Sequence, residues 1–395
     1  MTTTPFGNFQ YEIYLAGLSG AVPDLPMTYD GMEAGAREKL GPETYGYIAG
    51  GVGSEDTMRA NLEAFRRWRI VPRHLHDVGT RDLAVEIFGT TFPAPVLLAP
   101  IGGVQARTHP DAERAVARAA AALGLNLVLS TAASTSMEDV AAASGTGPRW
   151  YQLYWPREPE MARSFLSRAE ASGYSAIVVT LDTQLLAWRP RDLAAAFLPF
   201  LRGEGVANYF SDPVFRAGLE KAPEDDVPAA VMRWVSVFSD PTLTWDDLAF
   251  IRENTRLPIV LKGIIHPDDA RQAVDRGMNG VVVSNHGGRQ VDGALGALDA
   301  LPGVVDAVPD DFPVLFDSGI RCGADIFKAV ALGARAVLIG RPYMWGLALG
   351  GEAGVAHVLK CLLADFDLTM ALSGHASMAT VSRASLTREG DQAAG

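Results

Sequence analysis

The strongest constraint on the fold is a rhythm of short, almost wholly apolar runs, most of them followed by an amphipathic helical stretch. Such runs are typical of parallel strands that are buried on both faces. In chain order they read PVLLAP, LNLVLST, RWYQLYW, AIVVTLD, PIVLKGI, GVVVSNH, PVLFDSG and AVLIGRP. Strand–helix units of this kind, recurring at roughly 20–35 residues, predict an α/β protein with a (β/α)8 TIM barrel. A doubly wound open sheet is the alternative.

The spacing of these runs predicts one domain of 395 residues. We expect the barrel over residues 91–183 and 255–375, after an N-terminal helical extension at 1–90 and before a C-terminal tail at 376–395. Residues 184–254 interrupt the rhythm after the fourth strand and fit no single helix. Because long insertions of this kind lie over the C-terminal face of a barrel, we expect a lid there. A decorative loop or a subunit contact is the alternative.

Composition excludes several classes of function. A net charge of −12 argues against nucleic acid and anionic membranes as partners. The two cysteines, Cys322 and Cys361, form neither a disulfide framework nor a metal-ligand spacing, so we expect no metal and a reducing cytoplasm. The N-terminus does not resemble a signal peptide, and the uncharged stretch 119–137 is too polar to span a membrane.

Polar side chains stand at the ends of consecutive expected strands, where a barrel has no structural use for them. Core packing does not explain such a series, so we expect the chemistry at this face. The residues are Gln152 and Tyr154 after the third strand, Thr180 and Asp182 after the fourth, Lys262 on the fifth, Ser284, Asn285, His286 and Arg289 after the sixth, Asp317 after the seventh, and Gly340 and Arg341 after the eighth.

His286, within SNHGGRQ, is the candidate general base. Asp182 would hold its imidazole in one tautomer and stabilise it once protonated. A histidine that caps its strand and an aspartate that caps a helix are the alternatives. The glycines at 287 and 288 allow a tight turn that returns Arg289 to the pocket.

Two arginines, Arg189 and Arg289, follow the fourth and sixth strands. Aiming two bidentate donors into one cleft suits a substrate carboxylate. For Arg189 an ion pair with Asp192 is the alternative, and we expect the neighbouring Arg191 to point away.

A phosphate site is expected at the last two strands. DSGIRCGAD and IGRP place glycines, Arg321 and Arg341 where helical units begin, and backbone amides at such positions bind phosphate in many barrels. The absence of a Walker A sequence and of a GxGxxG fingerprint favours a mononucleotide cofactor. Lys262 suits a site where negative charge develops on a flavin ring; a lysine paired with a carboxylate is the alternative.

Four motifs together resemble one enzyme family. SNHGGRQ at 284–290, LKG at 261–263, DSGIR at 317–321 and IGRP at 339–342 are similar to the FMN-dependent L-2-hydroxy-acid oxidising enzymes. The resemblance runs from about Pro26 to Ser385. Within the family, YEIYLAGL, LDTQLLAWRPRDL and NYFSDPVF most resemble the lactate 2-monooxygenases.

The resemblance implies FMN as the cofactor and a role for each matching position. Catalysis falls to His286, Asp182, Tyr154 and Lys262. Substrate binding falls to Tyr47, Tyr154, Arg189, His286 and Arg289, although Tyr47 is nearly as plausible as a packing residue. Lys262 would lie beside flavin N1. The other cofactor contacts would be Pro100, Ile101, Gly102, Ser130, Gln152, Thr180, Ser284, Asp317, Gly319, Arg321, Gly340 and Arg341.

Two departures from the family pattern bear on specificity. Gly102 stands where many oxidases of the family carry alanine, and we expect the missing methyl to open space near the reactive edge of the flavin. Gln184, Leu185 and Leu186 replace bulkier aromatic residues, which would enlarge the pocket and puts lactate itself in doubt.

The resemblance thus implies an enzyme that oxidises L-lactate or a similar small L-2-hydroxy acid. With O2 it would decarboxylate the product to the shortened acid, CO2 and water. A simple oxidase that releases keto acid and H2O2 is the alternative, and a catalytically silent FMN-binding protein is a remote one. We expect a homo-oligomer, a tetramer or octamer, whose partners are the 2-hydroxy acid and O2.

Overall fold

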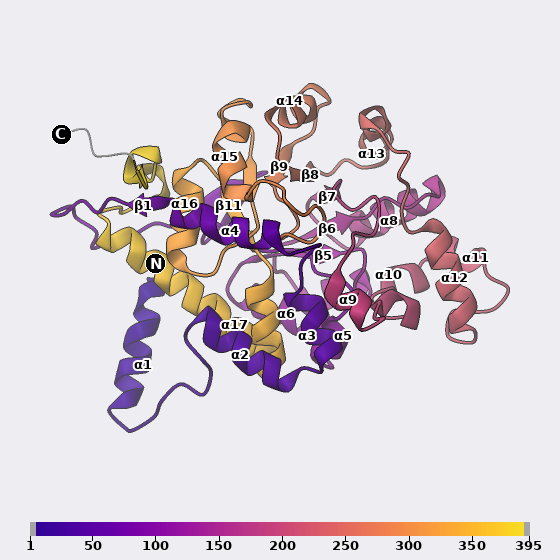
Figure 1. The fold of residues 1–395 in the computed structure, drawn as a ribbon, viewed down its shortest axis with the longest axis horizontal. Coiled ribbons are helices and arrows are strands. Elements are labelled where there is room, and N and C mark those ends of the chain that lie inside the picture. The colour runs from indigo at the N-terminus through magenta and orange to yellow at the C-terminus, as the bar shows by residue number, and fades with distance from the viewer. Residues whose placement is uncertain (1–4, 391–395) are drawn as a thin grey trace.

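The computed structural model describes residues 5–390, and its centre is a closed barrel of eight strands (Figure 1). Every neighbouring pair that is hydrogen-bonded in the barrel runs parallel. The strands are β4 (Val96–Leu98), β5 (Asn126–Ser130), β6 (Arg149–Leu153), β7 (Ile177–Thr180), β8 (Ile259–Ile264), β9 (Gly280–Val283), β10 (Val314–Phe316) and β11 (Ala336–Ile339). Each lies within one of the apolar runs, so the TIM-barrel prediction is confirmed and the open sheet is excluded.

Successive side chains of the strands face the barrel interior and the helices in turn. On β7, Val178 joins the inner cluster with Trp150, while Ile177 and Val179 pack outward. A hairpin of β2 (Val85–Ile87) and β3 (Thr90–Phe92) closes the N-terminal end of the barrel. Its Phe88 ring lies 5.5 Å from the Trp150 ring, centroid to centroid. The interior is therefore a packed core, and space for a ligand remains only at the opposite end.

Helices surround the barrel as the βα rhythm requires. They are α5 (Gln105–Thr108), α6 (Ala112–Ala122), α7 (Met137–Ser144), α8 (Pro159–Ala171), α14 (Pro267–Asp275), α15 (Ala297–Val305), α16 (Gly323–Ala331) and α17 (Arg341–Leu372). By length and composition α17 is the one helix within residues 5–390 that passes as a membrane span. Half of the residues in the most apolar stretch of α17 are buried inside the protein, and Gly350 and Gly351 break its helical geometry. Helices in a protein core can meet the same criteria of length and composition.

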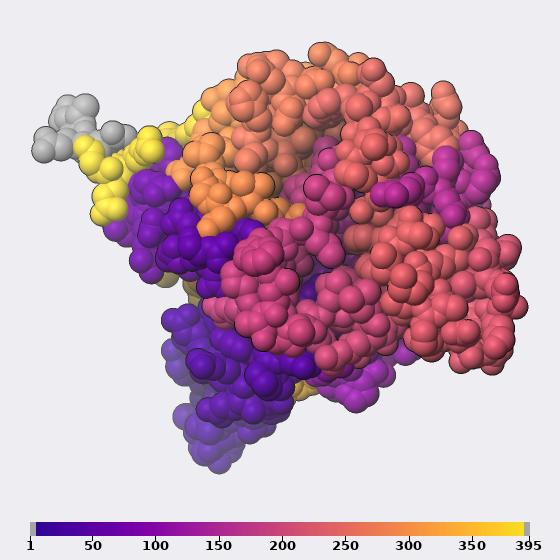
Figure 2. Space-filling view, turned by 45° about the vertical axis from the view of Figure 1, so that its right-hand side comes forward, coloured from indigo at the N-terminus to yellow at the C-terminus, as the bar shows by residue number. Residues whose placement is uncertain are grey.

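The expected N-terminal extension is mostly helical. It holds η1 (Phe6–Asn8), α1 (Phe9–Gly17), α2 (Tyr29–Lys39), α3 (Pro42–Ala49) and α4 (Asp56–Arg66), followed by β1 (Trp68–Ile70). Of these helices α1 lies at the edge of the molecule, whereas α4 is drawn across its middle (Figure 1); Figure 2 shows the indigo N-terminal segment at the lower left.

The expected C-terminal tail is partly structured. It contains η4 (Met378–Thr380), η5 (Arg383–Ser385) and β12 (Leu386–Arg388). Strand β12 pairs antiparallel with β1. This long-range pairing has no local sequence signal; residues 391–395 of the expected tail lie outside the described part of the chain.

The insertion after β7 folds into short helices, as its sequence, which fits no single helix, suggests. They are α9 (Pro190–Ala194), η2 (Pro199–Arg202), α10 (Ala207–Phe210), α11 (Pro213–Ala217), α12 (Val227–Val237), η3 (Trp245–Asp247) and α13 (Leu248–Asn254). Figure 2 shows this segment, magenta to salmon, gathered on one side of the molecule.

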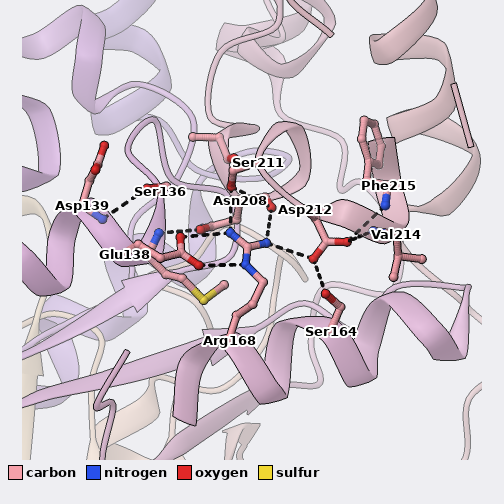
Figure 3. A network of polar contacts seen from close by, with 12 residues as sticks. Ser136, Glu138, Asp139, Ser164, Arg168, Asn208, Ser211, Asp212, Val214 and Phe215 are labelled. Atoms are coloured by element: carbon pink, nitrogen blue, oxygen red, sulfur yellow. Dashed lines mark hydrogen bonds and ion pairs between the residues drawn. The ribbon is translucent and has the colours of Figure 1, made fainter. Parts of the chain in front are cut away.

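A buried polar network fastens the insertion to the barrel helices (Figure 3). Arg168 on α8 donates to Asp212 Oδ2 at 2.9 Å, to the Asn208 carbonyl at 2.9 Å and to Glu138 on α7 at 2.8 Å. Ser164 donates to the same Asp212 oxygen at 2.6 Å. The Asp212 side chain is fully buried, so this contact is far less screened than a surface ion pair.

Arg168→Met should therefore loosen the insertion. Asp212 keeps its other donors, so we expect the loss of a charged hydrogen bond, about 1.5–3 kcal/mol of unfolding free energy. Urea denaturation measures this change. The control is Arg114→Met on α6, whose exposed pair with Asp139 should contribute ~1 kcal/mol or less. Equal stabilities of the two variants would contradict the anchoring role.

Candidate active site

A cavity opens where the C-terminal ends of the strands meet, with about 1090 Å³ of empty space including its mouth. This size and position are usual for small-molecule sites in barrels. Most residues proposed from the sequence line it: Tyr47, Pro100, Ile101, Gly102, Tyr154, Arg189, Lys262, His286, Arg289, Asp317, Gly319, Arg321, Gly340 and Arg341. Asp182, Ser130, Gln152, Thr180 and Ser284 stand behind this wall.

The candidate base and its partner are in contact. His286 Nδ1 lies 2.9 Å from Asp182 Oδ1, so Nε2 is left to face the cavity. Thr183 Oγ1 lies 3.2 Å from the same carboxylate oxygen and 3.4 Å from Nδ1. No helix begins directly after Asp182, since α9 starts at Pro190, so the helix-cap alternative does not apply. His286 adopts φ +58°, a strained conformation of the kind that clusters at functional sites.

The surroundings of the pair keep the imidazole available as a base. Burial lowers the pKa of His286, and Asp182 offsets this only in part. Burial alone would raise the pKa of Asp182, but His286 and Lys262 hold it below the usual value. At neutral pH the pair is therefore a neutral imidazole beside a carboxylate, which is ready to accept a proton at Nε2.

Two arginines meet beside His286. Arg189 donates to the Arg289 carbonyl at 3.1 Å and to Gln290 Oε1 at 2.6 Å. Arg289 donates to the carbonyls of Tyr47 and Gly50 and packs on the Tyr47 ring, 4.9 Å from its centroid. Burial, and then Arg189, lower the pKa of Arg289 to about 10, so the guanidinium stays charged at neutral pH.

Within residues 5–390 neither of these arginines has a carboxylate partner; Arg191 instead pairs with Glu55 at 2.8 Å. The expected alternative, an ion pair between Arg189 and Asp192, is not formed there. Two buried guanidiniums side by side repel each other and lack a counter-ion. An anionic ligand such as a carboxylate would relieve both costs.

The end of the cavity where we expect phosphate also contains two arginines, Arg321 and Arg341. Arg341 donates to the carbonyls of Ile48, Gly287 and Gly50 at 2.9–3.0 Å. Burial, and then its arginine neighbours, lower the pKa of Arg341 to about 9. Arg321 stacks on Tyr29, 4.1 Å from the ring centroid. In the described chain neither guanidinium meets a carboxylate, and both line the cavity, so a phosphate fits between them.

Lys262 is buried and lies between the two ends of the cavity. Its Nζ is 3.3 Å from Asp317 Oδ2 and donates to Ser284 Oγ at 3.0 Å. The expected alternative, a lysine paired with a carboxylate, is thus present, yet Lys262 also lines the cavity. Burial would lower the pKa of Lys262, but Asp317 and Asp182 raise it above the usual value. A permanent cation therefore faces the site.

Gln152 shows that the wall is built for a further partner. Its Oε1 accepts from Ser130 Oγ at 2.9 Å, whereas its Nε2 is buried without a hydrogen-bond partner among the residues that the structure describes. Buried amides rarely stay unsatisfied. An acceptor on a flavin ring would complete this group, and the arginines would hold the phosphate, so the residues present fit FMN.

The surroundings of Gly102 differ from the expectation that its missing methyl opens space near the flavin. A Cβ there would meet the Ala132 carbonyl oxygen at 2.6 Å and the Ala132 Cβ at 2.7 Å. The methyl would point into the loop after β5 and would not simply occupy space at the flavin edge. An alanine at this position therefore requires a backbone shift, and the expectation that the missing methyl opens space at the flavin edge does not agree with this direction of the Cβ.

Several cavity residues escaped the sequence reasoning. Phe200 and Phe238 from the insertion line the cavity, but apolar residues in an insertion look the same whether they pack or face a ligand. Thr183 touches both members of the catalytic pair. Gln290 donates to the Asp182 carbonyl and accepts from Arg189; its place in the SNHGGRQ motif was the available signal.

Comparisons with known proteins agree with this geometry. Residues 36–388 match the family model described as FMN-dependent dehydrogenase. The chain is 47% identical over 392 residues to the FMN-dependent alpha-hydroxy acid dehydrogenase qulF of Penicillium citrinum, covering 98% of this chain and 97% of that protein. It is 41% identical to an L-lactate oxidase of Lysinibacillus sphaericus, covering 96% of each. A crystal structure of mandelate oxidase matches with a TM-score of 0.80 and 38% identity, covering 92% of this chain and 98% of that one.

The family match spans the whole barrel, and these relatives cover nearly the full chain. The cavity supplies what such an enzyme needs: a base, cations for two anionic groups and an unsatisfied amide for a flavin. The chain therefore belongs to the FMN-dependent dehydrogenase family and is an FMN-dependent oxidoreductase of alpha-hydroxy acids.

Proposed function

We propose that this enzyme oxidises L-lactate or a similar small L-2-hydroxy acid and then decarboxylates the product it retains. The overall reaction is R–CH(OH)–COO⁻ + O2 → R–COO⁻ + CO2 + H2O. The observation that carries the proposal is the pair of arginines beside the His286–Asp182 pair, neither of which has a carboxylate partner within residues 5–390. FMN, when bound, would accept the two electrons of the oxidation.

The residues have separate tasks in this proposal. Arg189 and Arg289 bind the carboxylate of the substrate and so orient its C2 toward His286. His286 Nε2 takes the proton that leaves the substrate, and Asp182 stabilises the imidazolium that forms. Burial raises the pKa of Tyr154 to about 12, so its phenol stays protonated and donates a hydrogen bond to the substrate.

Retention of the keto acid is the step that separates decarboxylation from simple oxidation. Phe200 and Phe238 bring the insertion into the cavity wall, which supports a lid that slows product release. The sequence likeness to lactate 2-monooxygenases points the same way. The second candidate, a simple oxidase, is favoured by the relatives that are named L-lactate oxidase and mandelate oxidase.

Fewer residues than expected shape the part of the cavity that would hold the side chain of the substrate. Of Gln184, Leu185 and Leu186, only Leu186 lines the cavity. Leu185 is 69% exposed, so its replacement of an aromatic residue does not enlarge the pocket. We therefore propose acceptance of short aliphatic side chains, with Leu186 as the residue that limits their length.

Product stoichiometry tests the proposal. Wild-type enzyme with L-lactate should give one CO2 and one shortened acid per O2 consumed, and added catalase should leave O2 uptake unchanged. One keto acid and one H2O2 per O2, with catalase returning half of the oxygen, would replace the proposal with the simple oxidase.

Arg289→Lys should weaken substrate binding far more than FMN binding. Lysine keeps the charge but cannot form the two-pronged carboxylate contact. The loss of a charged hydrogen bond, about 1.5–3 kcal/mol, corresponds to a roughly 10- to 150-fold rise in KM. Steady-state kinetics and FMN fluorescence titration measure the two effects. Arg191→Lys, outside the cavity, is the control; loss of FMN with an unchanged KM would show that Arg289 serves the cofactor.

A further inference from the structure

Gln290 lies just outside the active-site cavity and contacts two residues of the site. It belongs to the loop between β9 and α15, is partly buried and does not line the cavity. Its side-chain oxygen accepts a hydrogen bond from Arg189 Nη2 at 2.6 Å. Its Nε2 donates to the main-chain carbonyl of Asp182. One amide therefore joins the loop after β9 to the segment after β7 that carries both of these residues.

The orientation of the Gln290 amide follows from these two neighbours. A guanidinium only donates hydrogen bonds, and a main-chain carbonyl only accepts them. If the amide were turned over, its NH2 group would face the Arg189 guanidinium and its oxygen would face the Asp182 carbonyl. Both hydrogen bonds would then be lost and replaced by repulsion. Gln290 therefore presents its oxygen to Arg189.

Gln290 holds Arg189 without neutralising it. Arg189 is buried, and its other acceptor is the Arg289 carbonyl at 3.1 Å, so both of its acceptors in the described chain are uncharged. These contacts use Nε and Nη2, and Nη1 has no partner among the described residues. Arg191, two residues further on, instead pairs with Glu55. A fixed guanidinium that keeps its charge and has free donors suits an anionic ligand.

We propose that Gln290 is a positioning residue for substrate binding: its amide orients Arg189 toward the substrate carboxylate and leaves the charge of the guanidinium available to that carboxylate. A carboxylate in place of the amide would form a stronger, charged hydrogen bond with Arg189 and would compete with the substrate. An apolar side chain would leave Arg189 charged but free to turn, so its preorganisation would be lost. This inference rests on the proposed function only in that Arg189 binds the substrate carboxylate.

Gln290→Glu tests the role of charge with two ligands of the same shape. Pyruvate is an anion, pyruvamide is its neutral amide, and neither has a hydrogen on C2 to lose. Their dissociation constants are measured from the change in flavin absorbance of the FMN-loaded enzyme, without turnover. We expect Gln290→Glu to raise the Kd of pyruvate roughly 10- to 100-fold and that of pyruvamide less than about threefold. Gln184→Glu, at an exposed position outside the cavity lining, is the control and should change neither Kd.

Two results with Gln290→Glu would overturn the inference. Equal losses for pyruvate and pyruvamide would mean that Gln290 only braces its loop. A pyruvate Kd close to that of wild type would mean that the charge of Arg189 does not depend on a neutral neighbour. In both cases a wild-type preference for pyruvate over pyruvamide would keep the carboxylate site of the proposed function. Wild type that binds the two ligands equally tightly would refute that site together with the inference.

A double-mutant cycle shows whether Gln290 acts through Arg189, and it keeps the inference testable if Gln290→Glu does not fold. Gln290→Met removes the acceptor without adding a charge, and should raise the Kd of pyruvate about fivefold. In an Arg189→Met background the same change should have less than about a twofold effect, because the effects of two residues in contact do not add. Full additivity would overturn the inference, since Gln290 would then act through another residue such as Asp182.

Discussion

Replacement of His286 should slow anaerobic flavin reduction by ~10²–10⁴-fold, the contribution of a positioned general base, while FMN stays bound. The imidazole lies against Asp182 at 2.9 Å, with Nε2 free toward the cavity. No neighbouring group can take over this role, because Lys262 and the two arginines are permanent cations. Stopped-flow absorbance of the flavin after mixing with an L-2-hydroxy acid measures the rate.

The choice of variant matters because His286 has φ +58°. Asparagine tolerates this left-handed conformation better than alanine does, so His286→Asn separates loss of the base from backbone strain. His266→Asn is the control, since His266 is exposed and caps α14. A His286 variant that reduces its flavin within tenfold of the wild-type rate would remove His286 from the role.

Lys262→Met should have the second-largest effect, on stability and FMN retention together. The change leaves Asp317 buried, 8% exposed, without its cation at 3.3 Å. Breaking a buried pair by removing one partner costs about 3–5 kcal/mol. Urea denaturation of the apoprotein measures this free energy, and fluorescence of released FMN measures retention.

The double variant Lys262→Met, Asp317→Asn distinguishes the ion pair from other roles of the lysine. Asparagine removes the stranded charge, so the double variant should recover much of the lost stability. FMN retention should stay low, because the cation that faces the cofactor is still missing. A single variant as stable as wild type would contradict the importance of the pair.

The barrel could be predicted from the sequence because its signal is local. Each strand is a short apolar run that ends in polar residues, and each run folded as expected, from Val96–Leu98 to Ala336–Ile339. The pairing of β1 with β12 could not be predicted. One segment precedes the barrel strands and the other follows them, and neither has a pattern that specifies the other.

The candidate site also has residues that the sequence predicts and residues that it does not. Residues at strand ends, such as Lys262 and His286, follow from topology because parallel strands end at one face. The contributions of Phe200 and Phe238 depend on the path of the insertion, which no local pattern encodes. Gly102 was misjudged because the direction of its missing Cβ, toward Ala132, is set by the tertiary packing of two loops.

Anaerobic titration of the FMN-loaded enzyme shows whether an L-2-hydroxy acid reduces the flavin. Glycolate, L-lactate, L-2-hydroxybutyrate and L-mandelate are added in turn while the flavin absorbance is recorded. We expect at least one short aliphatic L-2-hydroxy acid to bleach the flavin completely in wild type, and far more slowly in His286→Asn. A protein that binds FMN but is bleached by none of these acids would contradict this expectation.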